Sequence, residues 1–179
     1  MKGAGDIVAF WRAAGYEKWF TRDAAFDAAF DAAFRDEHLA ASRCELAHWL
    51  DTAEGALALL ILLDQFPRNV FRRSGHAYAT DPLARHYAAR MIEAGIDQKI
   101  DPVLRGFCYL PFQHSEDAAD QERSIALYEA LGDANQLDYA KAHRDAIRRF
   151  GRFPHRNAEL GRRSTPEEQA WLDAGGGFG

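Results

Sequence analysis

The sequence has few of the features that would assign a function directly. Its two cysteines, Cys44 and Cys108, form neither a CxxC pair nor any pattern with metal-ligand spacing. Such sparse cysteine is typical of a reducing cytosol rather than of a disulfide framework. No HExxH, GxSxG or phosphate-loop motif is present, so no enzyme class defined by those motifs is indicated. We therefore expect a cytoplasmic protein without a metal site, and no motif names a cofactor.

The sequence also lacks a membrane-spanning run, a secretion signal and an excess of positive charge. Its most apolar stretch, GALALLILL at residues 55–63, is too short to cross a bilayer. The first 15 residues contain no long apolar run and no cleavage site, so we expect no signal peptide. The net charge of −5 argues against non-specific binding to nucleic acid. Neither a membrane nor a nucleic acid is therefore expected as a partner.

Helical periodicity dominates what is present. Phe26, Phe30 and Phe34 recur at every fourth residue and predict one buried helix face. Residues 51–63 are apolar nearly all round, which predicts a central, fully buried helix. We also expect a short helix over 39–50, a helix over 136–150 and a last one that begins at 165–168. Pro67 should place residues 64 and 65 at a helix end.

No alternating strand pattern and no fixed repeat period can be found. The chain is therefore predicted to be all-α, with about eight antiparallel helices in a single domain over residues 1–174. Residues 175–179, GGGFG, should form a loose tail unless Phe178 docks on the domain.

Several motifs resemble one known family. They are LLDQFPRN at residues 62–69, ATD at 79–81, YLPF at 109–112, HSEDAADQE at 114–122 and RFPHRN at 152–157. Together they resemble the bacterial domain-of-unknown-function family 924 over nearly the whole chain. The resemblance implies a tetratricopeptide-like helical fold. It implies no activity.

The stretch after Tyr109 concentrates polar groups beside aromatic ones. His114, Glu116 and Asp117 are followed by Asp120, and a helix that begins at residue 115 or 116 would pair Glu116 with Asp120 at i, i+4. An acidic first turn also complements the helix dipole and needs no function. His114 is either a hydrogen-bonded core residue or a metal ligand or acid–base group.

Charge is segregated along the second half of the chain. Residues 114–139 carry seven acids against one arginine, a balance of −6, and residues 141–163 carry eight basic residues against two acids, a balance of +6. The simplest interpretation is that the two segments pair with each other. The alternative is that arginines of the two similar Phe-Pro turns, Arg68 and Arg156, face the residues after His114 and leave a pocket for an anion.

Three functions remain open on this basis. A binding module would hold a small anionic ligand or a peptide in a polar and aromatic cleft, with ligand contacts at Arg68, Asn69, Tyr109, His114, Arg156 and Asn157. A hydrolytic enzyme would draw its catalytic residues from His114, Glu116, Asp117 and His155, with or without a metal. A structural assembly protein would use the same groups as interlocking caps. The binding module is favoured by a small margin.

Overall fold

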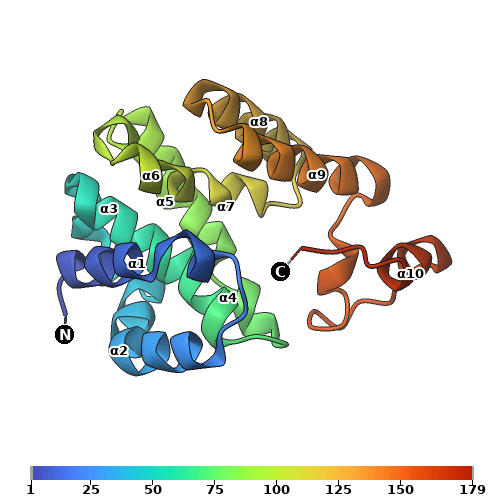
Figure 1. Ribbon diagram of the computed structural model, residues 1–179, viewed down its shortest axis with the longest axis horizontal. Helices are drawn as coiled ribbons and strands as arrows, with labels where there is room; N and C mark the ends of the chain where they lie inside the picture. The colour runs from blue at the N-terminus through green and yellow to red at the C-terminus, as the bar shows by residue number, and fades with distance from the viewer. Residues whose placement is uncertain (1, 179) are drawn as a thin grey trace. The chain divides into compact units, whose positions relative to one another are not determined.

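The computed structural model describes residues 2–178, and these residues form helices and turns without a strand (Figure 1). The predicted all-α class is therefore confirmed. The chain divides into two compact units, each described by itself. Unit 1 comprises residues 1–72 and 76–111, and unit 2 comprises residues 73–75 and 112–179. The single domain over 1–174 and the tetratricopeptide-like arrangement stay predictions.

Unit 1 is built around α3 and the π-helical turn that continues it. Its elements in chain order are α1 (Ala4–Trp19), α2 (Ala24–Ser42), η1 (Ala47–Asp51), α3 (Ala53–Leu60), η2 (Ile61–Gln65), α4 (Phe66–Val70), η3 (Gly75–Tyr78), α5 (Asp81–Glu93), η4 (Asp97–Lys99), α6 (Pro102–Arg105) and η5 (Gly106–Cys108). Residues 55–65 are all buried, and α3 contacts α1, α5 and η1. The predicted central helix is thereby confirmed.

The aromatic face of α2 packs as its spacing predicts. Phe26, Phe30 and Phe34 are buried, and all three rings lie within 5.4 Å of the Phe10 ring of α1, measured between centroids. Phe30 also meets the ring of Phe66 edge-on at 5.0 Å. This aromatic contact joins α1 and α2 to the end of the central helix.

Two predicted helix boundaries in unit 1 are wrong. No separate helix covers 39–50, because α2 runs on to Ser42 and Cys44 then adopts a left-handed φ of 61° that ends it. The chain also does not leave the helical region before Pro67. Instead η2 winds as a π-helix, the N–H of Phe66 bonds to the carbonyl of Ile61, and α4 follows directly. Asp64 and Gln65 therefore lie inside a continuous helical segment, and π-helical turns are frequent at functional sites.

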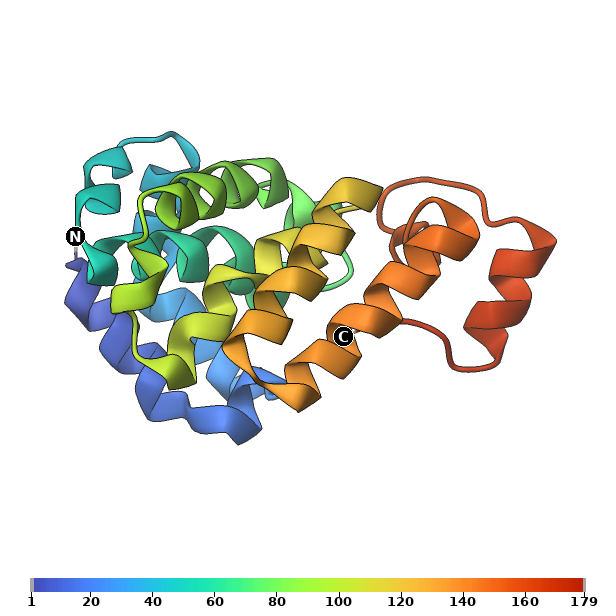
Figure 2. The same cartoon turned by 90° about the horizontal axis from the view of Figure 1, so that it is seen from above.

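Unit 2 has a helical pair followed by a short turn and a last helix. The chain enters it through α7 (Leu110–Gln113), and its further elements are α8 (Ala118–Leu131), α9 (Ala134–Phe150), η6 (Pro154–Arg156) and α10 (Pro166–Asp173). Helices α8 and α9 lie side by side in both views (Figures 1 and 2). Gly132 and Gly151 end them in left-handed conformation, and a Thr165–Glu168 capping box starts α10. The predicted helix over 136–150 and the predicted start of a last helix at 165–168 are confirmed.

The segment after α10 is packed onto unit 2. Phe178 is half-buried and packs with Trp171 against a small core of Ala146, Ile147 and Phe153. Of the two alternatives expected for this segment, docking of Phe178 is the one that the structure has.

Candidate functional site

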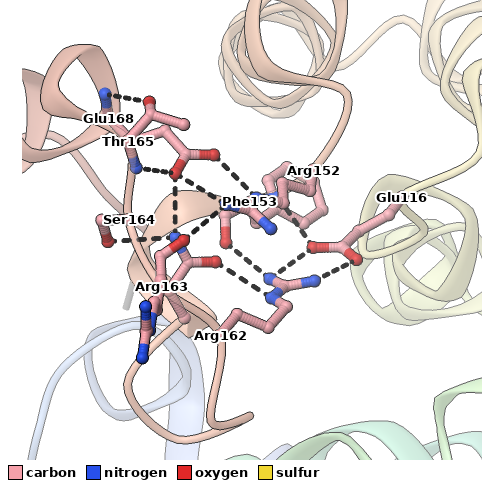
Figure 3. Close-up of polar contacts among 9 residues, drawn as sticks. Glu116, Arg152, Phe153, Arg162, Arg163, Ser164, Thr165 and Glu168 are labelled. Carbon is pink, nitrogen blue, oxygen red and sulfur yellow. Dashed lines mark hydrogen bonds and ion pairs between the residues drawn. The ribbon is translucent and has the colours of Figure 1, made fainter.

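Glu116 is the carboxylate that joins the start of α8 to the turn after α9 (Figure 3). Arg162 donates to both of its oxygens, at 2.8 and 2.9 Å, and the backbone N–H of Phe153 donates to Oε1 at 2.7 Å. Burial raises the pKa of Glu116, but the Arg162 and Phe153 hydrogen bonds outweigh it and hold that pKa below its ordinary value. Glu116 is therefore a charged, fully engaged group rather than a poised base.

Glu168 organises the neighbouring end of unit 2 (Figure 3). Arg152 donates to both of its oxygens, at 2.7 and 2.8 Å, and the N–H of Thr165 and the amide of Asn157 donate to Oε2. The Arg152 hydrogen bonds lower the pKa of Glu168 to about 2. Asn157 also donates to Ser164, so the predicted ligand contact at Asn157 has an internal role.

Three basic side chains lie around the ring of Phe153 in unit 2, and a fourth, His114, lies beside one of them. The Arg156 guanidinium lies over that ring, 4.7 Å from its centroid, and the rings of His143 and His155 each lie 5.6 Å from it. The ring of His114 is 6.1 Å from that of His143, and Arg156 donates to the His114 carbonyl at 2.8 Å. We call His114, His143, His155 and Arg156 the basic cluster.

His143 is the buried member of the basic cluster. Its Nδ1 lies 2.8 Å from the carbonyl of Tyr139, so this nitrogen carries the hydrogen and Nε2 keeps the lone pair. Burial lowers the pKa of His143 well below its ordinary value, and the positive charges of His114, His155 and Arg156 lower it further. The ionisable groups that lower the pKa of His143 are therefore all basic.

The start of α8 differs from the prediction. The helix begins at Ala118, and Asp117 caps it by accepting from the N–H groups of Ala119 and Asp120. Glu116 therefore precedes the helix and is not the i, i+4 helical neighbour of Asp120. Asp120 instead accepts a hydrogen bond from Ser115 Oγ at 2.6 Å. Asp117, a candidate catalytic residue, has a capping role.

The remaining predicted contacts lie in unit 1. Arg68 donates to both oxygens of Asp81, at 2.7 and 2.9 Å, and lies 3.2 Å from Asp64. Burial lowers the pKa of Arg68, but the two aspartates outweigh it and raise that pKa above its ordinary value. Asn69 donates to the Gln65 carbonyl, so this end of the central helix is held by internal polar contacts.

Tyr109 is likewise tied within unit 1. Its hydroxyl donates to Asp97 at 2.8 Å, and both burial and that carboxylate raise the pKa of Tyr109. A ligand role for Tyr109 stays a prediction, as it does for Arg68, Asn69 and Asn157.

The two Phe-Pro turns share one predicted feature. Phe66 and Phe153 are both fully buried, although Phe66 lies at the start of α4 within a continuous helical segment and not in a turn. Arg68 and Arg156, however, take their polar contacts inside their own units, with Asp64 and Asp81 in one and the His114 carbonyl in the other. A single site shared by both turns stays a prediction.

The predicted pairing of acidic and basic segments holds in part. Arg162 pairs with Glu116, and the exposed Arg148 of α9 pairs with Glu122 of α8. Arg152 instead pairs with Glu168, outside the acidic segment.

Sequence reasoning missed His143, Arg162 and Phe178 as parts of this region. His143 lies at helical spacing from Ala140, Ala146 and Ile147 on the buried face of α9, a pattern that signals burial but not a role. The positive balance of residues 141–163 contained Arg162, yet nothing in the sequence marked it out from the other arginines.

Other features of residues 2–178 concern metal ligation, membrane spans and surface hollows. No three His, Cys, Asp or Glu side chains in this range are grouped as metal ligands would be. No helix within it is long and apolar enough to cross a membrane. A shallow, open hollow of about 470 Å³ lies along α2 and contains none of the predicted site residues; it is lined by Lys2, Ala32, Ala33, Arg35, Asp36 and Glu37.

The comparisons with known proteins agree with the resemblance carried by the motifs. Residues 7–176 match the model of a family described as "Bacterial protein of unknown function (DUF924)". A solved structure, described as a protein of unknown function, ATU0120, from Agrobacterium tumefaciens, is 54% identical with a TM-score of 0.93. That match covers 96% of this chain and 97% of the other. No curated protein matches. The chain belongs to DUF924, a bacterial family of unknown function.

Proposed function

We propose that this protein is a binding module that holds a small anionic ligand, through a phosphate or carboxylate group, at the basic cluster of unit 2. The observation that carries the proposal is that His143, His155 and Arg156 lie around the buried ring of Phe153, with the His114 ring beside that of His143. Groups of one sign collected in a partly buried place favour a ligand of the opposite sign.

The charge of the cluster supports an anion rather than a cation. Glu116, the nearby carboxylate, is already neutralised by the two Arg162 hydrogen bonds. The charged groups that lower the pKa of His143 are His114, His155 and Arg156, all of them basic. A bound anion would relieve this repulsion and raise the histidine pKa values.

Arg156 supplies the recognition geometry in this proposal. Its guanidinium lies over the ring of Phe153 and is oriented by the hydrogen bond that it donates to the His114 carbonyl. A planar fork held in this way loses little further freedom when it binds a carboxylate or phosphate, which is the preferred partner of arginine. His155, which is only half-buried, would add a donor to the ligand.

Changes in the basic cluster also test the two competing functions. The hydrolytic enzyme is less favoured, because Glu116 is paired with Arg162 and Asp117 caps α8. The structural assembly protein is supported by the internal hydrogen bonds of Asn69, Tyr109 and Asn157. It predicts that changes in the basic cluster alter stability alone.

A thermal-shift series with inorganic phosphate, sulfate and succinate at constant ionic strength separates these functions. A ligand that binds only the folded state raises the melting temperature. Arg156→Lys keeps the charge and removes the fork, and His155→Gln removes a titrating ring. Both should reduce the shift produced by the anion that stabilises wild type.

Arg148→Gln is the matched control. It removes one positive charge from the same unit, but at an exposed pair with Glu122. It should leave the anion-dependent shift unchanged. Equal shifts in all four proteins, or no shift with any of the three anions, would count against the basic cluster as a binding site.

A further inference from the structure

Phe178 lies in a cage of four rings, His143, Phe153, His155 and Trp171. It stacks on His143 with ring centroids 3.7 Å apart and planes 18° apart. Phe153 and His155 meet it edge-on at 5.9 and 5.5 Å, and Trp171 lies 6.2 Å away at a tilt. His143 belongs to α9, His155 to η6 and Trp171 to α10, and Phe153 directly precedes η6. Several elements of unit 2 therefore build the cage.

The residues before Phe178 fit the cage because they have no side chains. A Cβ on Gly176 would lie 2.2 Å from the Trp171 ring and 2.6 Å from the Trp171 carbonyl oxygen, which no real side chain tolerates. Gly177 has a φ of +138°, and a Cβ on it would lie 3.2 Å from the Cβ of His155. The cage therefore accepts an aromatic residue only when the two residues before it in the chain are very small.

The segment is held by different forces along its length. The N–H groups of Gly175 and Gly176 donate to the carbonyls of Leu172 and Trp171 at 2.9 Å, as the last turn of α10 closes. Beyond Gly176 the contacts described are those of the Phe178 ring with the cage. Because ring contacts and not backbone hydrogen bonds hold Phe178, its side chain can leave the cage while α10 stays folded.

We propose that this cage is a binding site for an aromatic side chain carried on a Gly-Gly-aromatic peptide segment, and that Phe178 of the same chain fills it as an exchangeable plug. His143 is both the stacking surface of the cage and a member of the basic cluster, so the plug covers part of that cluster. The cage goes beyond the proposed anion site and does not depend on it, since an aromatic residue brings no negative charge.

The test follows the histidine ring signals of the full chain by ¹H–¹³C NMR. A ring stacked at 3.7 Å shifts the His143 Cε1–H resonance strongly, so Phe178→Ala should move it away from its wild-type position. Adding acetyl-Gly-Gly-Gly-Phe-amide to that variant should return the resonance toward its wild-type position in a saturable way, at millimolar peptide or above. Wild type should respond less, because its tethered Phe178 competes at an effective concentration on the order of millimolar.

Three further samples make the test specific. Acetyl-Gly-Gly-Gly-Ala-amide lacks the ring and should produce no return. Acetyl-Gly-Gly-Ala-Phe-amide places a methyl group where Gly177 approaches His155, and it should bind at least several-fold more weakly. Tyr139→Ala removes an exposed ring one turn from His143 but keeps the carbonyl that accepts from Nδ1, so it should leave the peptide response at the wild-type level.

Gly176→Ala provides a second route to the open cage. It keeps Phe178 but drives a Cβ against Trp171, so it should move the His143 resonance in the same direction as Phe178→Ala and admit the peptide. An unchanged His143 resonance in both variants would overturn the proposal. So would equal peptide responses in wild type and variants, or no saturable response in either variant. A phosphate titration of the same samples reports separately on the anion site.

Discussion

Replacement of Glu116 by glutamine tests whether the carboxylate between α8 and η6 holds unit 2 together. Glutamine keeps one oxygen for the Phe153 N–H but turns an NH₂ group toward Arg162 in place of a charged acceptor. Hydrogen bonds to charged groups contribute about 1.5–3 kcal/mol each, and removing one member of a fully buried pair costs about 3–5 kcal/mol. The Glu116 side chain is 29% exposed and Arg162 is 23% exposed, so solvent screening reduces these values. We expect a loss of about 1–3 kcal/mol.

Glu122→Gln is the matched control for this change. Glu122 lies in the same unit and pairs with Arg148, but the two side chains are 53% and 58% exposed. An exposed pair of this kind contributes about 0–1 kcal/mol. Urea unfolding followed by circular dichroism gives both values under one condition, and the m-value shows whether the transition keeps its character.

A double-mutant cycle assigns the loss to the pair itself. The cycle of Glu116→Gln with Arg162→Gln should give a coupling energy of about 1 kcal/mol or more, and the cycle at Glu122 and Arg148 about 0–0.5 kcal/mol. Because the pKa of Glu116 is lowered in the folded state, its contribution is present above the ordinary value of 4.5 and is lost as pH falls through the folded pKa. Equal losses for Glu116→Gln and Glu122→Gln at pH 7, with no coupling to Arg162, would refute the reasoning.

Three other outcomes follow from the structure. Leu60→Asp places an unpaired carboxylate in the buried central helix and should cost about 4 kcal/mol or more, or prevent unit 1 from folding; a urea transition like that of wild type would contradict it. The pKa values of His143 and His38 are lowered in the folded state, so the stability that these neutral histidines contribute is fully present above about pH 6.5 and is lost as pH drops toward the folded pKa values. His143→Gln should therefore make the free energy of unfolding depend less on pH between about 7.5 and 5. Glu168, with its pKa lowered to about 2, should contribute stability that is lost as pH falls from 4.5 to 2. Glu168→Gln should therefore destabilise the protein more at pH 7 than Glu167→Gln, which changes the neighbouring exposed pair with Arg149. Equal melting temperatures of the two variants would contradict this.

Local signals were enough to predict the helical class and its best-marked boundaries. The phenylalanine spacing of α2, the all-round apolar stretch of α3 and the Thr165–Glu168 capping box each depend on residues within a few positions of one another. Their structural outcome is set by short-range geometry that a single sequence displays directly.

The start of α8 was not predictable in the same way. The sequence favoured Ser115 or Glu116 as the start of this helix, but the Glu116 carboxylate pairs with Arg162, which is 46 positions further along the chain. Once Glu116 is held by Arg162 and by the Phe153 N–H, Asp117 is left to cap Ala119 and Asp120. Long-range ion pairing therefore decided a boundary that local propensity left open.

The π-helical turn shows a second limit. A proline after an apolar helix predicts the end of that helix. In η2, however, the hydrogen-bond register shifts before Pro67, since the N–H of Phe66 bonds to the carbonyl of Ile61, and α4 continues the helical segment through the proline. Asp64 and Arg68 are four residues apart in this continuous helical segment and lie on the same side of it, 3.2 Å apart. Such a register change leaves no periodic signal in the sequence.

The most direct test of anion binding at the basic cluster is a phosphate titration of the full chain, followed through the ¹H–¹³C signals of the histidine rings at constant ionic strength. Binding at the cluster predicts saturable shifts of the His114, His143 and His155 signals, with a single dissociation constant and with His38 and His48 unmoved. The same titration of Arg156→Lys should be at least several-fold weaker. Linear, unsaturated shifts spread over all histidines, or identical curves for wild type and Arg156→Lys, would contradict the account.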